Sequence, residues 1–333
     1  MVEFSKNEAG NAGPAIPVID VGLLRSPFTA DRHRVAGEIR LAALDTGFFY
    51  IRNHGVSQKL IDRVFERAAA FFALPIDEKM RVATTNGRPS RGYHPMQAIA
   101  LETGAPPDVK ESMTFGLDLT EEDPRVVAGR FDRCPNLWPG QIAGLRETIE
   151  CYFSEMTELR NVLMCGLALS LGMEEHFFEE YTKEGLDRVA LLHYPPQPAD
   201  PMPGEKGCGA HTDFGGVTIL MQDQNGGLQV LDEDSGEWID AVPMAGAFVV
   251  NLGDQIQRWT EGRYRSNMHR VINDSGRERY SVAFFSNGNP DYIIDRLPGV
   301  NGGKREHAFE PISVETYLRR RGAEARMQEI SDV

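Results

Sequence analysis

The second half of this chain is built from short strand-like segments, and this pattern restricts the fold more than any other feature. Runs of β-branched and aromatic residues follow one another from residue 188 to residue 286, separated by turns rich in Gly, Asn, Asp and Ser. The predicted strands are Arg188–Tyr194, Val217–Gln222, Gly227–Leu231, Glu237–Ala241, Ala247–Leu252, Met268–Val271 and Arg279–Ser286. Many short strands joined by tight turns favour an antiparallel sandwich or a jelly roll.

The first half of the chain shows helical periodicity instead. Apolar residues recur there at three- and four-residue spacing, which is the pattern of helices packed on a core. The predicted helices are Asp31–Asp45, a segment that begins at Ser57 and is stopped by Pro75, a long helix from Pro139 to Leu171, and a last helix at Ser313–Met327. Two short strands, Ile16–Asp20 and Gly47–Asn53, are predicted before and after the first helix.

No flexible linker separates the two patterns, so we predict one compact structural unit of the α+β class. Its centre is a double-stranded β-helix (jelly-roll) core of antiparallel strands, buttressed by α-helices. The expected parts are a flexible N-terminus (1–15), an N-terminal α/β region (16–130), scaffold helices (131–186), the jelly-roll core (187–290) and a C-terminal segment with a helix (291–333). Residues 84–110 are rich in Gly and Pro and indicate a long loop, of a kind that is often functional.

The composition disfavours several classes of partner. The 333 residues carry a net charge of −14, which argues against nucleic acid and anionic membrane surfaces, because both require clustered Lys and Arg. A small-molecule substrate is expected instead. The N-terminus lacks an apolar signal segment, and no run of about 18 apolar residues predicts a membrane span. The four cysteines form no CxxC pair and suit a reducing cytoplasm, so we expect a cytoplasmic location.

Two histidines and one aspartate form the candidate metal site. His211 and Asp213 are two residues apart, so on one strand their side chains share a face. His269 lies in a later predicted strand that a jelly roll can fold back beside the first pair. Two imidazoles and one carboxylate on one side of an ion form the facial triad of non-haem Fe(II) oxygenases, which leaves other positions open. The alternative is three polar residues satisfied by hydrogen bonds, since an HxD pattern alone is expected by chance.

Three further residues form a candidate anion site. Arg279 and Ser281 point the same way in an extended strand. A guanidinium forks onto a carboxylate with two hydrogen bonds, and a hydroxyl adds a third. Tyr194 can donate its phenolic hydroxyl to the same group, whereas His193 alternates to the opposite face and is predicted not to bind metal. Taken alone, an arginine in a strand is more often a surface charge.

At this point the chain resembles the isopenicillin N synthase-like, 2-oxoglutarate-dependent Fe(II) oxygenases. The matching segments cover most of the chain and are IPVID at 16–20, GFFYIRNHG at 47–55, RGY at 91–93, LLHYPP at 191–196, GAHTDFGGVTIL at 209–220, GGLQV at 226–230, VVNLGD at 249–254, SNMHRV at 266–271 and RYSVAFF at 279–285. The resemblance makes region 16–130 an N-terminal region of the non-haem dioxygenase type. It also makes region 187–290 the Fe(II)/2-oxoglutarate jelly-roll core.

The resemblance implies specific roles for the candidate residues. His211, Asp213 and His269 would bind Fe(II), and Arg279, Ser281 and Tyr194 would bind the distal carboxylate of 2-oxoglutarate. Plant members often carry an asparagine two residues before the tyrosine. This chain has Leu192 there, as bacterial and fungal members more commonly do.

The reaction implied by the resemblance is that of a non-haem Fe(II) 2-oxoglutarate-dependent dioxygenase. O₂ is consumed, 2-oxoglutarate is oxidatively decarboxylated to succinate and CO₂, and a small-molecule substrate is hydroxylated, desaturated or cyclised. Ascorbate is the expected reductant. A natural-product intermediate of secondary metabolism is one candidate substrate, with free amino acids and nucleobases as others. The sequence does not indicate the oligomeric state.

Several residues are candidates for substrate contact. Phe285 shares a strand face with Arg279 and Ser281, and the resemblance puts an aromatic substrate wall at that position. Phe214 follows the candidate ligand Asp213 and could flank the substrate. The remaining predicted lining residues are Arg91, Tyr93, Met113 and Phe115. Each of them has an alternative interpretation as core or loop packing.

Two other functions compete with this interpretation. One is an oxidase or synthase of the same fold that does not consume 2-oxoglutarate; isopenicillin N synthase itself keeps the RxS motif and takes its electrons from the substrate. The other is a non-catalytic jelly-roll protein with a structural metal such as zinc, which would need a fourth protein ligand. The sequence offers no convincing fourth ligand. A DNA-modifying oxygenase is disfavoured by the acidity of the chain.

Overall fold

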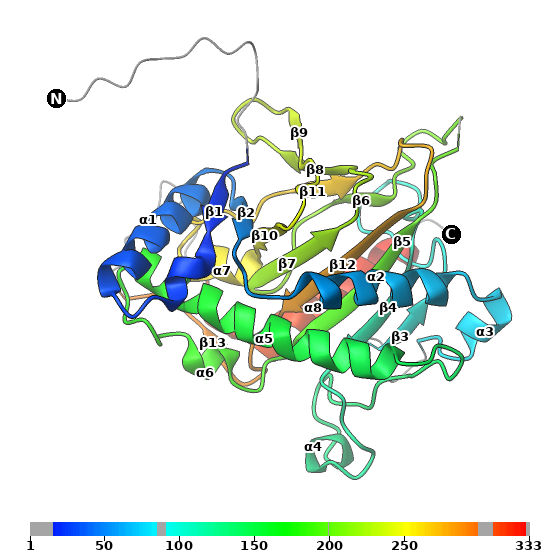
Figure 1. Cartoon of the computed structure of the whole chain (residues 1–333), viewed down its shortest axis with the longest axis horizontal. Coiled ribbons are helices and arrows are strands. Elements are labelled where there is room, and N and C mark those ends of the chain that lie inside the picture. Colours follow the sequence, from blue (N-terminus) through cyan, green and yellow to red (C-terminus); the bar gives the residue numbers. More distant parts are fainter. Residues whose placement is uncertain (1–15, 85–90, 199, 299–308, 331–333) are drawn as a thin grey trace.

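The computed structural model describes residues 16–84, 91–198, 200–298 and 309–330, so the expected flexible N-terminus at 1–15 lies outside the described residues. Two facing β-sheets form its centre (Figure 1). The larger sheet contains, in spatial order, β1 (Val18–Asp20), β2 (Phe48–Arg52), β10 (Phe248–Leu252), β7 (Val217–Gln222), β12 (Arg279–Ser286), β5 (Arg188–Tyr194), β4 (Glu111–Gly116) and β3 (Gly92–His94). The smaller sheet contains β6 (Cys208–His211), β11 (His269–Val271), β8 (Leu228–Leu231) and β9 (Trp238–Asp240).

Neighbouring strands in both sheets are antiparallel, except that β1 runs parallel to β2. A short separate pair joins β13 (Ile293–Ile294) to β14 (Ile312–Ser313). Two stacked layers of antiparallel strands with helices outside them confirm the predicted α+β class and its jelly-roll core.

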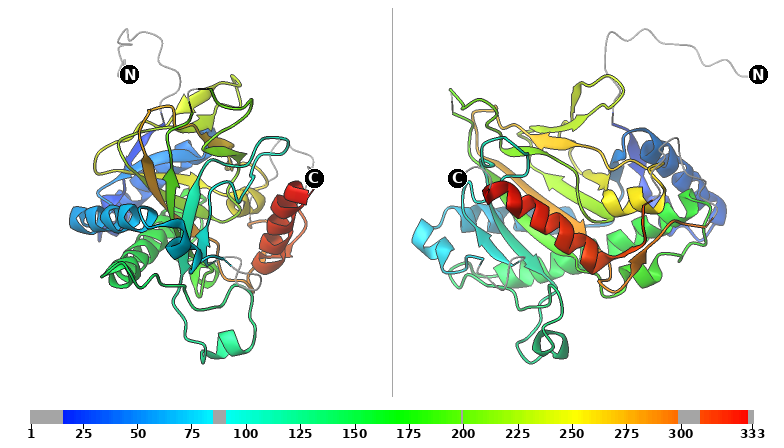
Figure 2. Two further views of the ribbon diagram at one scale, coloured as in Figure 1. Left: turned by 90° about the vertical axis from the view of Figure 1, so that its right-hand side faces the viewer. Right: turned by 180° about the vertical axis from the view of Figure 1, so that it is seen from behind.

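The long helices lie on both sides of the larger sheet. α2 (Gln58–Phe72) and α5 (Leu145–Ser170) cover one face, and α1 (Thr29–Asp45) packs against α5. Figure 2 shows α8 (Val314–Ile330) on the opposite side of the sheet from α5. The short helices are η1 (Val21–Arg25), α3 (Ile76–Met80), α4 (Pro124–Val127), α6 (Glu179–Thr182) and α7 (Asp254–Trp259). In the part of the chain that the structure describes, no helix is both long and apolar enough to cross a membrane.

Helix boundaries were predicted well where a capping residue marks them. The Ser57 hydroxyl accepts the backbone N–H of Leu60, as expected of the residue that caps α2. The predicted start of the long helix at Pro139 is wrong, because α5 begins at Leu145. Gly144 immediately before it has a φ of 72°, which is left-handed and cannot belong to a right-handed helix.

Residue alternation along the central strands separates two cores. On β12, Val282 and Phe284 point toward the helices, whereas Arg279, Ser281 and Phe285 point into the space between the sheets. We call the apolar cluster beneath α1, α2 and α5 the helix-side core. The inter-sheet core comprises Ile16, Phe48, Tyr50, Tyr194, Cys208, Leu228, Val230, Ala241, Val249 and Val271. The candidate site lies on this second side.

Candidate metal centre and active site

The candidate metal ligands are brought together by the smaller sheet. β6 and β11 pair antiparallel with His269 opposite His211. β6 ends at His211, so Asp213 does not lie on the same strand as we expected. Instead, its backbone carbonyl accepts the N–H of Asp254 at 2.8 Å, which fixes the turn after the strand. One ligand atom from each of the three side chains lies within 4.8 Å of the other two.

Backbone carbonyls orient both imidazoles. Nδ1 of His211 lies 2.8 Å from the carbonyl oxygen of Gly209, and Nδ1 of His269 lies 3.2 Å from that of Asn267. A carbonyl can only accept, so each Nδ1 carries the proton and each Nε2 keeps its lone pair. Both Nε2 atoms face Oδ1 of Asp213 at 3.8 Å. This second layer of hydrogen bonds is typical of metal-binding histidines.

The protonation states suit a divalent metal. Burial lowers the pKa of His211 and, together with the nearby His211 ring, that of His269. Burial alone would raise the pKa of Asp213, but the two imidazoles and the Asn251 amide outweigh it and bring the net pKa below its usual range. Asn251 donates to Asp213 Oδ2 at 2.7 Å. The site thus offers two neutral nitrogens and one anionic oxygen, a donor set that fits Fe(II).

The candidate anion site lies on the neighbouring strands of the larger sheet. Arg279 on β12 is fully buried and lies opposite Tyr194 on β5, with its guanidinium carbon 4.7 Å from the centre of the tyrosine ring. It donates at 3.3 Å to the Ser281 hydroxyl and at 3.3 Å to the Gln222 amide oxygen. No carboxylate among the described residues forms an ion pair with it. A buried cation without an anionic partner is costly, so this site favours an anionic ligand.

One cavity connects the two sites. It has a volume of about 110 Å³ and opens between the candidate metal ligands, Tyr194, Arg279 and Ser281. Lys110, Thr218 and Asn251 are its other polar lining residues. The apolar part of its lining consists of Phe48, Leu101, Leu192, Cys208, Leu220, Leu228, Val271, Ala283 and Phe285. Phe285 therefore lies on the cavity wall, and its contact with a substrate stays a prediction.

Four of the predicted lining residues lie elsewhere. Met113 and Phe115 are in the helix-side core, because odd-numbered residues of β4 point toward the helices. Tyr93 also lies there and donates its hydroxyl to Glu111. The Arg91 guanidinium is 3.4 Å from Asp132. The structure thus corrects the prediction for these four residues, which were expected to lie in loops beside the cavity.

A fifth predicted lining residue, Phe214, also lies outside this cavity and contacts the C-terminal helix α8. The guanidinium carbon of Arg321 on α8 lies 4.4 Å from the centre of its ring. The same guanidinium donates to the Thr212 hydroxyl at 3.3 Å and pairs with Asp254 at 3.3 Å. α8 therefore contacts the segment between two candidate metal ligands, which no local sequence signal indicated.

His193 behaves as predicted and does not face the cavity. Its two ring nitrogens lie 2.7 Å from Glu111 and 2.5 Å from Glu278, on the helix side of the sheet. Sequence reasoning missed Asn251, Gln222 and Lys110, which lie within or beside the site. Asn251 belongs to the quoted VVNLGD segment, but nothing in that segment indicates its hydrogen bond to Asp213. The pairing of β10 with β7, which sets Asn251 opposite Thr218, brings the two side chains together.

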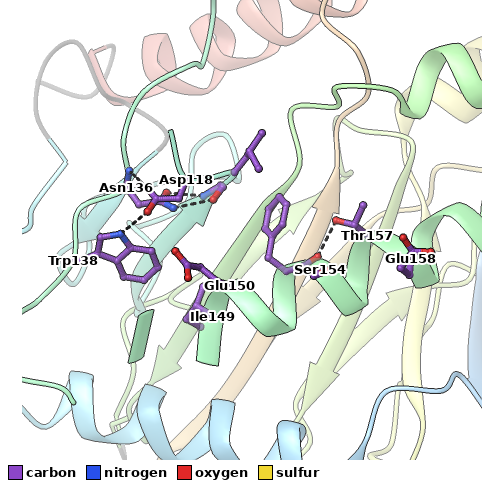
Figure 3. Close-up of a pocket in the computed structure, with 11 residues that line it drawn as sticks. Asp118, Asn136, Trp138, Ile149, Glu150, Ser154, Thr157 and Glu158 are labelled. Atoms are coloured by element: carbon purple, nitrogen blue, oxygen red, sulfur yellow. Dashed lines mark hydrogen bonds between the residues drawn. The ribbon is translucent and has the colours of Figure 1, made fainter. Parts of the chain in front are cut away.

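A second hollow lies between α5 and the segments Gly116–Asp118 and Asn136–Trp138 (Figure 3). Its volume is about 390 Å³. The carboxylate of Asp118 accepts from the Trp138 indole at 3.1 Å and pairs with Arg146 at 2.8 Å, and Glu150 accepts from the same arginine at 2.8 Å. No residue of the metal-site cavity lines this hollow. Its polar centre is satisfied within the chain, so it shows no comparable chemistry.

Two protein-family models match the chain. The model described as non-haem dioxygenase in morphine synthesis N-terminal matches residues 16–141, and the 2OG-Fe(II) oxygenase superfamily matches residues 182–288. The 2-oxoglutarate-Fe(II) type oxidoreductase hxnY of Emericella nidulans is 40% identical over 92% of this chain and 89% of its own length. The 2-oxoglutarate-dependent dioxygenase citB of Monascus ruber is 40% identical over 91% of this chain and 93% of its own length.

Solved structures agree with the sequence relatives. A full-length Neurospora crassa protein crystallised in complex with alpha-KG matches with a TM-score of 0.82 and 30% identity, covering 93% of this chain and 96% of that protein. Further structures of the same Neurospora crassa protein contain thymine or 5-formyluracil in addition to alpha-KG. With its predicted jelly roll and a His–Asp–His cluster in place, this chain belongs to the 2OG-Fe(II) oxygenase superfamily, as an isopenicillin N synthase-like oxidoreductase that uses Fe(II) and 2-oxoglutarate.

Proposed function

We propose that His211, Asp213 and His269 hold the catalytic Fe(II), and that Arg279, Ser281 and Tyr194 hold the distal carboxylate of 2-oxoglutarate. The observation that carries this proposal is the shared cavity, whose lining contains both the metal donors and a buried guanidinium that has no carboxylate partner among the described residues. A dicarboxylate anchored at Arg279 neutralises that cation. Its other end is then directed toward the metal donors.

The residues of the chain position the reactants rather than perform the redox step. Bound iron supplies the activation of O₂ that couples decarboxylation of 2-oxoglutarate to oxidation of the substrate. Asn251 keeps Asp213 oriented, and Gln222 keeps the guanidinium of Arg279 aimed along β12. The apolar side chains around the cavity exclude water, which strengthens the charge interactions inside it.

We propose that the substrate is a small, largely apolar molecule with a ring system, and that its reaction is hydroxylation. Phe285 and Phe48 contribute aromatic surface to the cavity, whose exposed lining is mostly apolar although several polar residues border it. The relatives include the 2-oxoglutarate-dependent dioxygenases citB and tropC and clavatol oxidase claD. These names support a natural-product intermediate as the substrate, and the Neurospora crassa complex with thymine supports including that nucleobase among the compounds tested.

We further propose that ascorbate maintains the ferrous state and that the protein works in a reducing cytoplasm. None of the four cysteines, all of which lie in the described residues, forms a disulfide bond. The Cys208 thiol lies 3.8 Å from Nδ1 of the candidate ligand His211. A reducing compartment keeps both thiols and Fe(II) in the required state.

The test is release of succinate by the protein with Fe(II), 2-oxoglutarate, ascorbate and air, with and without aromatic polyketides, phenolic acids and thymine. We expect a slow background release that one substrate class accelerates. The Asp213→Ala variant serves as the metal-site control. If substrate is oxidised without succinate formation, the chain uses the synthase-type reaction and the role proposed for Arg279 is wrong.

A further inference from the structure

The strand that carries His211 is an edge strand with an irregular register. Among the described strands, β6 pairs only with β11, and this pairing shifts by one residue between His211 and Cys208. Gly209 and Ala210 are therefore two residues opposite one, which is a β-bulge. Bulges next to active sites re-aim a side chain. Here the bulge immediately precedes His211.

Two carboxylates from the loop between β3 and β4 (residues 95–110) bind the backbone of this bulge. Asp108 Oδ1 accepts the N–H of Gly209 at 2.8 Å, and Glu102 Oε2 accepts the N–H of Ala210 at 2.7 Å. A Cβ atom added to Gly209 would lie 2.6 Å from the Cβ of Glu102, so the loop packs too closely for any residue but glycine. The loop thus takes the place that a neighbouring strand has elsewhere in the sheet.

Each carboxylate is paired with a lysine. Lys110 Nζ lies 2.6 Å from Asp108 and 2.9 Å from the thiol of Cys208 on β6, and this group is buried beside the cavity. Lys206 Nζ lies 2.9 Å from Glu102 in a more exposed position. Asp108 and Lys110 therefore form a buried ion pair that contacts β6, the strand that carries His211.

The Asp108–Lys110 pair is connected to His211 through one residue, Gly209. Gly209 donates its N–H to Asp108, and its own carbonyl oxygen accepts the Nδ1 proton of His211. The Asp108 carboxylate thus holds Gly209 in place, and the carbonyl of Gly209 orients the His211 ring. The Gly209 carbonyl shares its peptide unit with the N–H of Ala210, which donates to Glu102, so that hydrogen bond also strengthens the bond to His211.

We propose that Asp108 and Lys110 are positioning residues for the metal centre, which set the orientation of His211 and hence the affinity for the metal. The inference rests on the proposed Fe(II) site. Glu102 and Lys206 form an outer, weaker arm of the same device. Removing a partner beyond the direct ligands typically lowers metal affinity by about 10- to 100-fold.

The chain provides a matched control. Lys79 and Glu111 form another buried lysine–carboxylate pair, 2.7 Å apart, on the helix side of β4. No hydrogen bond of the described residues links this pair to a candidate metal ligand. Lys79→Met should therefore lower the melting temperature in the same way as Lys110→Met, while leaving the metal site unchanged.

The experiment is a titration of metal-free protein with Co(II), followed by visible absorption, which reports affinity and ligand geometry without turnover. Asp108→Asn and Lys110→Met are expected to raise the Co(II) dissociation constant by about tenfold or more and to alter the spectrum. Lys79→Met is expected to change neither. Glu102→Ala, at a more exposed position, should show a smaller increase in the dissociation constant, so a folded variant is available if the buried ones unfold.

The outcomes separate this inference from the proposed function. Parent-like Co(II) affinity and spectra in folded Asp108→Asn and Glu102→Ala would overturn the positioning role while leaving the metal centre in place. The same loss of Co(II) affinity in Lys79→Met would show that the Asp108–Lys110 pair acts only through the stability of the fold. That result would overturn the positioning role. A parent protein that binds no Co(II) would overturn the proposed metal centre, and this inference with it.

Discussion

The two faces of the larger sheet use buried polar groups in opposite ways. On the helix side, Glu111 accepts from Lys79, Tyr93 and His193, so a buried carboxylate is satisfied within the chain. On the side that faces the smaller sheet, Arg279 is buried without a carboxylate among the described residues. Both networks lie in the same sheet and are comparably buried. A buried polar group that is satisfied stabilises the fold, whereas one that lacks its natural partner indicates a ligand.

The strands make this division possible because adjacent residues serve different faces. Leu191 lies in the helix-side core and Leu192 lines the cavity, although they are consecutive in β5. Phe284 and Phe285 repeat the arrangement on β12. Matched substitutions at such neighbours therefore separate effects on stability from effects on function.

The largest expected effect is loss of the metal. Asp213→Ala removes the only anionic donor of the His–Asp–His cluster. We expect succinate formation to fall by about a thousandfold or more, because the metal supplies several kcal/mol of stabilisation in such reactions. Bound iron, measured by metal analysis, should fall with it. Substantial turnover with stoichiometric iron in the variant would contradict the proposed ligand set.

The next largest effect is expected at the anion site. Arg279→Leu removes a charge-assisted pair worth about 3 kcal/mol, so the KM for 2-oxoglutarate should rise by about a hundredfold. Arg91→Leu is the control, since Arg91 is also buried but is paired with Asp132 outside the cavity. That variant should lose stability and keep the parent KM. A common effect of both variants on KM would contradict the contrast between the two faces.

A smaller effect is expected in the cores. Leu191→Ala deletes a fully buried side chain of the helix-side core and should reduce the free energy of unfolding by about 2–5 kcal/mol. Leu192→Ala should cost less stability, because this side chain borders a cavity, and should raise the KM for 2-oxoglutarate or substrate. Urea unfolding and steady-state kinetics on both variants measure the two quantities. An exchange of these effects between the variants would reverse the assignment of faces.

The aromatic pair on β12 tests the substrate wall. Phe285→Leu is expected to raise the KM for the substrate by about tenfold, consistent with losing an aromatic contact of about 1 kcal/mol or slightly more. The KM for 2-oxoglutarate should stay the same. Phe284→Leu should instead lower the melting temperature, because its ring packs against Phe153 in the helix-side core.

The smallest effect is a pH dependence on the helix side. Burial lowers the pKa of His193, but its bonds to Glu111 and Glu278 more than offset this, so the net pKa lies above the ordinary 6.5. The stability that protonated His193 contributes is therefore fully present below that value and is lost as the pH rises through the folded-state pKa. The difference in unfolding free energy between the parent and His193→Gln should be larger at about pH 6 than at about pH 9.

Sequence reasoning succeeded where the signal is local. The limits of β5, β7 and β12 were predicted to the residue, because each is a run of apolar or β-branched residues between clear turns. The His–Asp–His cluster and the Arg279–Ser281 pair were likewise marked by spacing and motif. Their meeting in one cavity depended on the fold that the resemblance suggested.

Sequence reasoning failed where the signal lies in another part of the chain. β4 was not predicted, since its charged Glu111 disguises a buried strand whose carboxylate is satisfied by Lys79. Without that strand, Met113 and Phe115 could not be assigned to a face of the larger sheet. They were predicted to line the cavity, but they lie in the helix-side core. The bulge at Gly209 and its carboxylate partners were also invisible, because they depend on contacts about 100 residues apart.

The alternation along β12 has a consequence for how such proteins can tolerate insertions and deletions. Deleting a single residue within Arg279–Ser286 would turn every following side chain to the other face, so that Phe284 would enter the cavity and Phe285 the helix-side core. The turn at Ser275–Gly276 before the strand can absorb a change in length without this inversion. Length variation among relatives should therefore accumulate in the turns, while the strand itself changes by substitution alone.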